Sequence, residues 1–287
     1  LLRIAVSGEN FAFYSIIGQL VFGFASFLSP KIYSLFIFYK DEINMIMINK
    51  MPWISIYWIF SIISILMIII ISNIKFQKIK LSSNEKFNSN ISFNYFLRNK
   101  NTYLNFFAIF SYVGIEQGIN NWSSQFLYQY HGLDTTEVGI QVISSFWGNL
   151  TIGTIISLFL IKIFKSKFLL QFYALSSMII LSFALFADAE TSVFSFKLMG
   201  LSISGIWSIL IALGLNSVKK HHGVFSGILI TGIVGGAFFP FLIAFIGDFL
   251  GLKVGMFIIF LGLVYLLVVG LIAKPLILNN TIEFKIK

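Results

Sequence analysis

Cysteine is absent from the 287 residues, and charged residues make up only 11% of them. The lack of cysteine excludes disulfides, thiolate chemistry and cysteine-based zinc sites. The scarcity of charge argues against a nucleic-acid-binding surface, despite a formal net charge of +9. The adjacent His221 and His222 have no acidic neighbour and would point about 100° apart on a helix. We therefore expect no metal site, no bound cofactor and no nucleic-acid partner.

Apolar residues fill the chain instead, at 57% of the total, with 34 phenylalanines. They gather in eight continuous segments: Phe11–Phe38, Pro52–Ser72, Thr102–Tyr128, Thr136–Ile161, Phe168–Ala187, Val193–Val218, Val224–Ile246 and Val254–Ala273. Each can cross the hydrocarbon layer of a bilayer as a helix, which needs ~20 residues. The runs do not alternate with polar residues, so barrel strands are not expected. The sequence predicts an all-α integral membrane protein surrounded by lipid.

The sign of the charge alternates along the gaps between these segments. Basic gaps carry Arg3; then Lys75, Lys78, Lys80, Lys86, Arg98 and Lys100; then Lys162, Lys165 and Lys167; then Lys219 and Lys220; then Lys274, Lys285 and Lys287. The intervening gaps carry Asp41, Glu42, Asp134, Glu137, Asp188, Glu190 and Asp248. Loops rich in Lys and Arg stay cytoplasmic. Both ends of this multi-pass chain are therefore expected in the cytoplasm, with the protein in a bacterial inner membrane.

One gap is much longer than the others and divides the segments into two groups. Residues 73–101 are rich in Lys, Ser and Asn, which is typical of a cytoplasmic linker. We interpret residues 1–72 as the last two helices of an N-terminal half-bundle, and residues 102–287 as a C-terminal half-bundle of six helices with a short tail. A transporter of two similar halves has this organisation if four helices precede the first segment. The abrupt start at Leu1 favours this interpretation over a complete eight-helix protein.

The third segment is the most polar and contains SYVGIEQGINNWSSQ, residues 111–125. On a helix, Glu116, Gln117, Asn120, Asn121 and Ser124 fall within ~140° of one another. Glu116 is the only acidic residue deep in any segment, and an ionised carboxylate at that depth is costly unless it faces a cavity, a partner or water. Glu116 is therefore a candidate proton carrier; the alternative is that it holds two helices together. The neighbouring amides donate and accept hydrogen bonds, as binding of sugar hydroxyls requires.

The other segments contribute fewer polar groups. Gln19 shares a face of the first segment with Gly23 and Ser26, Gln141 shares a face of the fourth segment with serines, and Asn149 lies beside that face. Trp207, in the sixth segment, is suited to stack on the apolar face of a sugar. For each of these residues the alternative is ordinary packing, helix bridging or an interfacial position. In the seventh segment, Gly235, Gly236 and Pro240 predict a bend.

Four stretches resemble the fucose/glucose/galactose–proton symporter family of the major facilitator superfamily. They are SGENFAFYSIIGQLVFGFASFLSP (7–30), SYVGIEQGINNW (111–122), GLSISGIWSILIALGLNSV (200–218) and GILITGIVGGAFFPFLIAFIGDFLG (227–251). The second and fourth are the more specific. The resemblance implies a major-facilitator-type bundle in which eight of an expected twelve helices are present, helices 5 to 12.

The resemblance also implies where a substrate would bind. Gln19 matches a sugar-contact position, and Glu116 matches the polar position of helix 7. Two positions depart from the family pattern: Phe22 stands where an Asn is common near the sugar, and Ser208 stands where Pro is common in helix 10. The family's best known proton-coupling acids lie in helices 1 and 4, which have no counterpart here. The departures leave the identity of the sugar open.

We expect a secondary active transporter rather than an enzyme. It would move a monosaccharide such as fucose, glucose or galactose by alternating access with proton symport, as a monomer. The expected substrate-binding residues are Gln19, Gln117, Asn120, Asn121, Gln141, Asn149 and Trp207, with Glu116 as the proton-coupling candidate. Efflux of a drug-like or metabolite substrate is the alternative within the superfamily. A membrane-embedded transferase is less favoured, because no cluster of acidic or His residues marks a membrane face.

Overall fold

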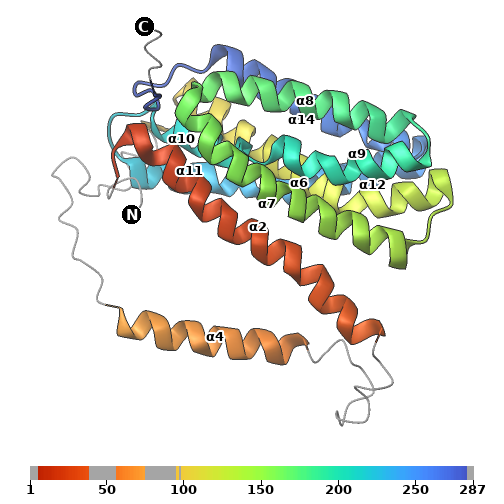
Figure 1. Cartoon of the computed structure of the whole chain (residues 1–287). Helices are drawn as coiled ribbons and strands as arrows, with labels where there is room; N and C mark the ends of the chain where they lie inside the picture. Colours follow the sequence, from red (N-terminus) through yellow and green to blue (C-terminus); the bar gives the residue numbers. More distant parts are fainter. Residues whose placement is uncertain (1–5, 39–55, 75–94, 97, 283–287) are drawn as a thin grey trace, which may run out of the picture.

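The computed structural model describes residues 6–38, 56–74, 95–96 and 98–282 (Figure 1). Within these residues the regular structure is helical, without a strand. The elements in chain order are α2 (Gly8–Phe38), α4 (Ile56–Asn73), α6 (Lys100–His131), the π-helical turn η2 (Thr135–Gly139), α7 (Ile140–Ile163), α8 (Ser166–Phe186), α9 (Ala189–Ile203), α10 (Ile206–Leu215), α11 (His222–Thr231), the 3-10 turn η3 (Gly232–Val234), α12 (Gly235–Leu250), α13 (Leu252–Gly255) and α14 (Phe257–Ile272).

These elements reproduce the eight predicted apolar segments, so the expected all-α membrane fold with eight helices is confirmed. Within the described residues, six helices are long and apolar enough to cross a membrane: 8–29, 135–163, 166–186, 189–215, 222–250 and 252–272. α6 is long but more polar, and the apolar helix at 57–73 is shorter than these six. The start of the second segment at Pro52, the acidic gap with Asp41 and Glu42, and residues 75–94 of the expected linker lie outside the described residues.

Two of the spans are interrupted near their middle. α9 and α10 meet at Ser204 and Gly205, where an added Cβ on Gly205 would lie 2.8 Å from the Ser157 hydroxyl and from the Tyr173 ring. α11 and α12 are separated by the 3-10 turn at Gly232–Val234, and Pro240 follows inside α12. The seventh segment is therefore interrupted in the stretch where a bend was expected. Interrupted helices expose backbone groups that a regular helix would satisfy.

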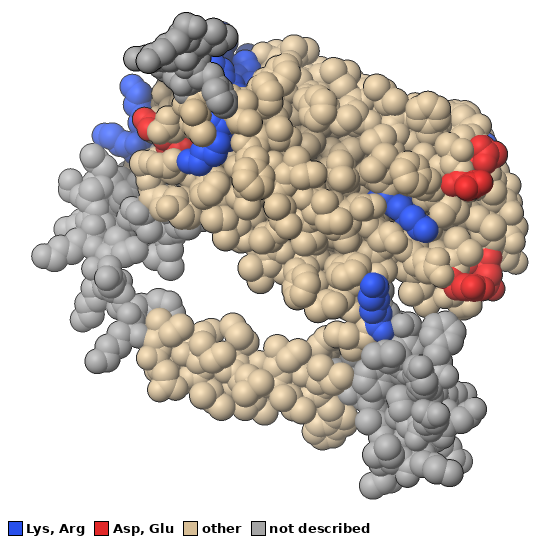
Figure 2. All heavy atoms as spheres, viewed as in Figure 1, with Lys and Arg blue, Asp and Glu red and all other residues tan. Residues whose placement is uncertain are grey.

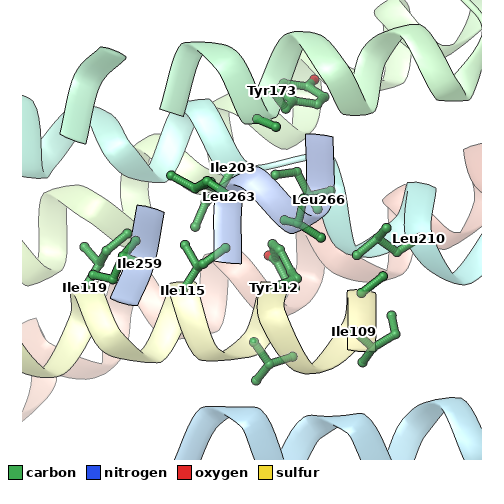
Figure 3. Close-up of a cluster of buried hydrophobic side chains, with 14 of the residues drawn as sticks. Ile109, Tyr112, Ile115, Ile119, Tyr173, Ile203, Leu210, Ile259, Leu263 and Leu266 are labelled. Atoms are coloured by element: carbon green, nitrogen blue, oxygen red, sulfur yellow. The ribbon is translucent and has the colours of Figure 1, made fainter. Parts of the chain in front are cut away.

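α6 lies at the centre of the bundle and packs against α12, α14, α10 and α11. Figure 3 shows Ile115 and Ile119 of α6 beside Ile259 and Leu263 of α14, and all four are fully buried. Lipid is as apolar as these side chains, so close packing rather than escape from water stabilises such contacts.

α2 crosses the bundle along α7 and also reaches α10. Small residues permit this close approach: a Cβ on Gly23 would lie 2.8 Å from Thr151 Oγ1, and one on Gly148 would lie 2.9 Å from the Phe27 ring. α4 lies apart from the bundle in Figure 1, with apolar side chains exposed on all sides. A helix that is apolar all round suits surroundings of lipid.

The two ends of the bundle differ in charge, as the sequence pattern predicts (Figure 2). Asp134 and Asp188 lie at one end as the N-caps of η2 and α9. The hydrogen bond from the Thr136 hydroxyl, with the backbone N–H groups of Glu137 and Thr136, holds the pKa of Asp134 below its usual range. The hydrogen bonds from Thr191 lower the pKa of Asp188 in the same way. These caps satisfy N–H groups that the first helical turn leaves without partners.

At the opposite, basic end, residues 274–282 form a strap across several helix ends. Backbone N–H groups of Leu276, Asn280 and Ile282 donate to the carbonyls of Asn216, Glu9 and Lys162, respectively. The Asn279 side chain accepts from Ser166 N and Oγ and donates to the carbonyls of Ile161 and Phe164. The strap thus connects α2 with the ends of α7 and α10 and with the start of α8.

Candidate substrate cavity

A cavity of about 570 Å³ lies where α2, α6 and α10 meet. Its lining comprises Tyr14, Ser15, Gly18, Gln19, Phe22, Tyr112, Val113, Glu116, Gln117, Trp207 and Ile233. A slightly larger cavity of about 610 Å³ lies at the basic end beside Lys219 and Lys220, among residues that bear no relation to the polar groups of α6. The first cavity is the candidate site, because it contains the acidic residue that the sequence places deep in a span.

A chain of hydrogen bonds crosses this cavity from α10 through α2 to α6. The Ser208 hydroxyl donates to Gln19 Oε1 at 3.0 Å, and Gln19 Nε2 donates to the Tyr112 hydroxyl at 3.4 Å. The Tyr112 hydroxyl donates in turn to Glu116 Oε2 at 2.7 Å. From the other side, Gln117 Nε2 donates to Glu116 Oε1 at 3.3 Å. Gln19 and Glu116 are each 7% exposed and Tyr112 is 1% exposed, so the chain is shielded from bulk solvent.

Helix geometry explains why these groups meet. Tyr112 and Glu116 are four residues apart on α6, so their side chains lie one above the other on the same face. Trp207 and Ser208 follow the break at Gly205, on the first turn of α10. The Trp207 ring lies 6.2 Å from the Tyr112 ring, centroid to centroid. The cavity thus combines an aromatic wall with amide, hydroxyl and carboxyl groups, a combination suited to a small polyhydroxylated ligand.

The structure gathers four of the expected site residues at this cavity: Gln19, Glu116, Gln117 and Trp207. Asn120 is close to it but is engaged elsewhere, because its Oδ1 accepts from Trp147 Nε1 at 2.9 Å. Trp147 in turn packs edge-on against Phe22 of the lining, with ring centroids 5.7 Å apart. Asn120 is therefore part of the support behind the cavity wall.

The other three expected residues do not line this cavity. Asn121 is exposed on α6. Gln141 lines a separate hollow at the acidic end, beside Phe27 and Lys31. The Asn149 side chain donates to the Lys197 carbonyl at 2.8 Å, joining α7 to α9. The geometry gives these three residues no shared site with Glu116.

Sequence analysis did not single out Tyr112, Tyr14 or Ser15 as site residues. Tyr112 carries a detectable signal, because its spacing of four residues from Glu116 places it about 40° away on a helix. Tyr14 and Ser15 carry none, because they reach the cavity only through the packing of α2 on the bundle. Phe22 lines the cavity, and Ser208 hydrogen-bonds to Gln19, so both departures from the family pattern fall at the site.

The part of the chain that the structure describes contains no cluster of residues that could bind a metal ion. No group of three or more His, Asp or Glu side chains there lies close enough together to hold an ion. Glu116 has an amide and a phenol as its side-chain neighbours. Amide, phenol and carboxyl groups can hydrogen-bond to a neutral ligand, and a carboxyl group can also take up a proton.

Comparison with known proteins gives a similarity in sequence. No family model matches the chain. Over 169 residues it is 27% identical to the glucose/galactose transporter of Brucella abortus, in two strains. The matched region covers 58% of this chain and 41% of that protein, so the chain spans less than half the length of these curated relatives.

Solved structures give a similarity in fold. The fucose:proton symporter FucP of E. coli matches with a TM-score of 0.77 and 16% identity, over 95% of this chain and 71% of that chain. A second FucP structure, of a major facilitator superfamily transporter in the outward conformation, matches with a TM-score of 0.63 and 17% identity, over 78% and 54% of the two chains.

The chain therefore has the helical fold of the major facilitator superfamily and is a multi-pass membrane protein. The resemblance to the fucose/glucose/galactose–proton symporter family that four sequence stretches indicate is confirmed. The relatives named in both comparisons are transporters, not enzymes.

Proposed function

We propose that this chain belongs to a secondary active transporter that moves a monosaccharide across a membrane together with a proton. The observation that carries the proposal is the shared cavity of Gln19, Trp207 and Glu116. An amide and a ring face suit the hydroxyls and the apolar face of a sugar. A buried carboxyl group in a membrane span is a group that can take up a proton.

The arrangement of helices supports alternating access at this cavity. The cavity is lined by α2, from residues 1–72, and by α6 and α10, from residues 102–287. We assign residues 1–72 to one half-bundle, residues 73–101 to the linker, and residues 102–287 to the other half-bundle. Relative motion of two such halves would open the cavity first to one side of the membrane and then to the other.

The charge difference between the two ends supports an orientation. We place the basic end, which carries Lys162, Lys165 and Lys219, in the cytoplasm of a bacterial inner membrane. Both ends of the chain then lie in the cytoplasm. The cavity lies within a single chain, and we propose that the transporter works as a monomer.

Uptake of labelled D-glucose, D-galactose and L-fucose by cells that express the full protein tests the proposal. Gln19→Ala removes one acceptor and one donor from the cavity and should weaken binding of the transported sugar by about 5- to 100-fold, because each hydrogen bond contributes about 0.5–1.5 kcal/mol. Gln129→Ala, on an exposed face of the same bundle, is the matched control and should bind as the parent does. If none of the three sugars bound or entered the cells, the assignment to sugar transport would be wrong.

Glu116→Gln tests the proton role separately. The substitution keeps the shape of the side chain but removes its titratable proton. We expect normal amounts of protein in the membrane and retained sugar exchange, with loss of uptake against a gradient. A role of Glu116 in holding helices together would instead lower protein level and uptake in parallel.

A further inference from the structure

The cavity of about 610 Å³ at the basic end of the bundle carries charge of one sign. Lys219 and Lys220 line it, together with Asn99 and His221. Among the described residues of its lining there is no Asp or Glu. Glu9 is the described acidic residue at this end, and it lies outside the lining. The cavity therefore attracts a negatively charged ligand.

The start of α11 adds a second attraction for negative charge beside the same cavity. α11 begins at His222, and its N-cap residue, His221, has left-handed backbone angles of φ 57° and ψ 39°. No side chain of the described residues caps this helix start. The first N–H groups of a helix have no partner within the helix, and the helix dipole favours an anion there. The two lysines and the helix start thus suit the same kind of ligand.

An apolar groove of about 470 Å³ lies between α6 and α11. Its lining extends from Thr102 to Phe107 on α6 and from Val224 to Thr231 on α11. At a rise of 1.5 Å per residue, the groove follows α11 for about 10 Å. Gly227 leaves it open, because none of the described atoms lies within 4 Å of a Cβ added there. The length and the lining suit a hydrocarbon chain.

The cavity and the groove involve the same two helices, about one turn apart. On α6, Asn99 of the cavity precedes Thr102 of the groove by three residues. On α11, His221 of the cavity precedes Val224 of the groove by three residues. A ligand that fills both therefore has an anionic head at the basic end and an apolar chain directed into the membrane.

Thr102 lies where the groove begins. Its side chain is 2% exposed, and its hydroxyl oxygen has no hydrogen-bond partner among the described residues. A buried hydroxyl without a partner destabilises a fold. An ester carbonyl, the acceptor that lies between the phosphate and the acyl chains of a phospholipid, would give this hydroxyl a partner.

We propose that the cavity and the groove together bind one anionic phospholipid. The phosphate lies at Lys219 and Lys220, an ester carbonyl accepts from Thr102, and an acyl chain lies between α6 and α11. Basic pockets between membrane helices suit anionic headgroups in this way. The inference goes beyond the proposed transport and does not depend on which substrate is carried.

Other occupants fit the observations less well. Residues 75–94, which end directly before Tyr95 of the cavity lining, carry four lysines and one glutamate. Their net charge has the same sign as that of the cavity, so the two repel each other. Free phosphate would match the charge of the cavity but would leave the groove empty and Thr102 without an acceptor. A phospholipid satisfies the cavity, the groove and the hydroxyl together.

Thermal unfolding of the purified full protein in a neutral detergent, with dioleoylphosphatidylglycerol added stepwise, tests this inference. A ligand that binds the folded state raises the melting temperature as its concentration passes the dissociation constant, so the titration gives an apparent affinity. We expect this lipid to bind about 10- to 30-fold more tightly than dioleoylphosphatidylcholine, which has the same chains but no net charge. Inorganic phosphate, compared with chloride at the same ionic strength, should leave the melting temperature unchanged.

Two lysine pairs separate the cavity from the general charge of the basic end. Lys219→Gln with Lys220→Gln removes both charges of the cavity and should abolish the preference for phosphatidylglycerol. Lys165→Gln with Lys274→Gln is the matched control, because it removes the same charge from exposed positions outside the cavity. The control should keep the preference of the parent.

Two further variants test the apolar part of the site. Gly227→Phe places a ring in the groove and should remove the binding of phosphatidylglycerol. Ile230→Phe, at an exposed position of α11 outside the groove, is its control and should bind as the parent does. Thr102→Val keeps the shape of the side chain but removes the hydroxyl. It should weaken binding about 2- to 10-fold without lowering the melting temperature of the lipid-free protein.

Several outcomes would overturn the inference. If phosphatidylcholine bound as tightly as phosphatidylglycerol, or if both lysine pairs had the same effect, the contact with lipid would be unspecific. If inorganic phosphate raised the melting temperature as the lipid does, the cavity would be a site for a free anion. A parent-like affinity in the cavity lysine pair, in Gly227→Phe or in Thr102→Val would also contradict it. Sugar enters none of these measurements, so their failure would leave the proposed function standing.

Discussion

The contact between α2 and α7 is sensitive to a single added methyl group. A Cβ on Gly23 would lie 2.8 Å from Thr151 Oγ1 and 3.3 Å from Leu150 Cδ2, whereas ordinary contact begins at 3.4 Å. In Gly23→Ala, the Thr151 hydroxyl must therefore retreat by about 0.6 Å, the difference between 3.4 and 2.8 Å. It cannot do so without cost, because it donates to the Trp147 carbonyl at 2.9 Å and its β-branched side chain has few rotamers.

We expect Gly23→Ala to lower the free energy of unfolding by about 1–3 kcal/mol, the usual cost of overpacking. For a protein of this size that corresponds to a fall of about 2–12 °C in the melting temperature. The assay is thermal unfolding of the purified protein in one detergent, followed by tryptophan fluorescence. Gly227→Ala is the control, because nothing lies within 4 Å of its added Cβ, and it should be neutral or slightly stabilising.

A double-mutant cycle decides whether the proposed contact is the cause. Thr151→Ala removes the obstructing hydroxyl, so the methyl group of Gly23→Ala should cost less in its presence. We expect an interaction energy of more than about 0.5 kcal/mol between the two substitutions. Strict additivity, or a melting temperature of Gly23→Ala equal to that of Gly227→Ala, would refute the reasoning.

Three further predictions concern other parts of the bundle. Trp122→Phe removes the 3.1 Å hydrogen bond from Nε1 to the Pro240 carbonyl and should lower the free energy of unfolding by about 0.5–1.5 kcal/mol; an unchanged melting temperature would count against that bond. Asp134→Ala should destabilise the protein at neutral pH but less in acid, since a carboxyl with a lowered pKa stabilises the fold above its usual pKa and loses this effect as the pH falls through the folded pKa; a difference in melting temperature that did not vary with pH would contradict this. In a chain without cysteine, Asp134→Cys should react with an impermeant thiol reagent in intact cells, and Lys219→Cys should react only after permeabilisation; the reverse pattern would overturn the orientation.

Hydropathy and charge predict the number and sides of the helices because both depend on composition over long stretches. The breaks inside helices were harder to predict from the sequence. Gly232 to Pro240 carries a glycine and proline signal that predicts its bend. At the break at Ser204 and Gly205, the Ser157 and Tyr173 side chains from neighbouring helices lie close to the backbone, and no local sequence pattern records these contacts.

The sequence predicted site residues correctly only where their positions on a single helix determine that they face the cavity. Glu116 and Gln117 could be placed because α6 is regular and its polar stripe is narrow. The helical wheel could not separate Asn120 from Asn121 in their roles, since packing of α7 supplies the Trp147 donor that engages Asn120. Gln141 and Asn149 are polar residues of the same kind as Gln19, but neither lines the cavity. How α7 packs in the bundle decides this, and the sequence of α7 alone does not reveal it.

The strap of residues 274–282 is attached unequally to the two sides of the proposed transporter. Asn279 and Ile282 bond to α7 and α8, which both belong to the half-bundle that we propose for residues 102–287. The bond from Asn280 to the Glu9 carbonyl is the one that reaches α2. If α2 moves relative to the other half-bundle, as we propose, this bond and the neighbouring one from Asn216 to the Gly8 carbonyl would break, while the bonds to α7 and α8 would persist. On that proposal the strap would act as a tether with one permanent attachment, to α7 and α8, and one releasable attachment, to α2.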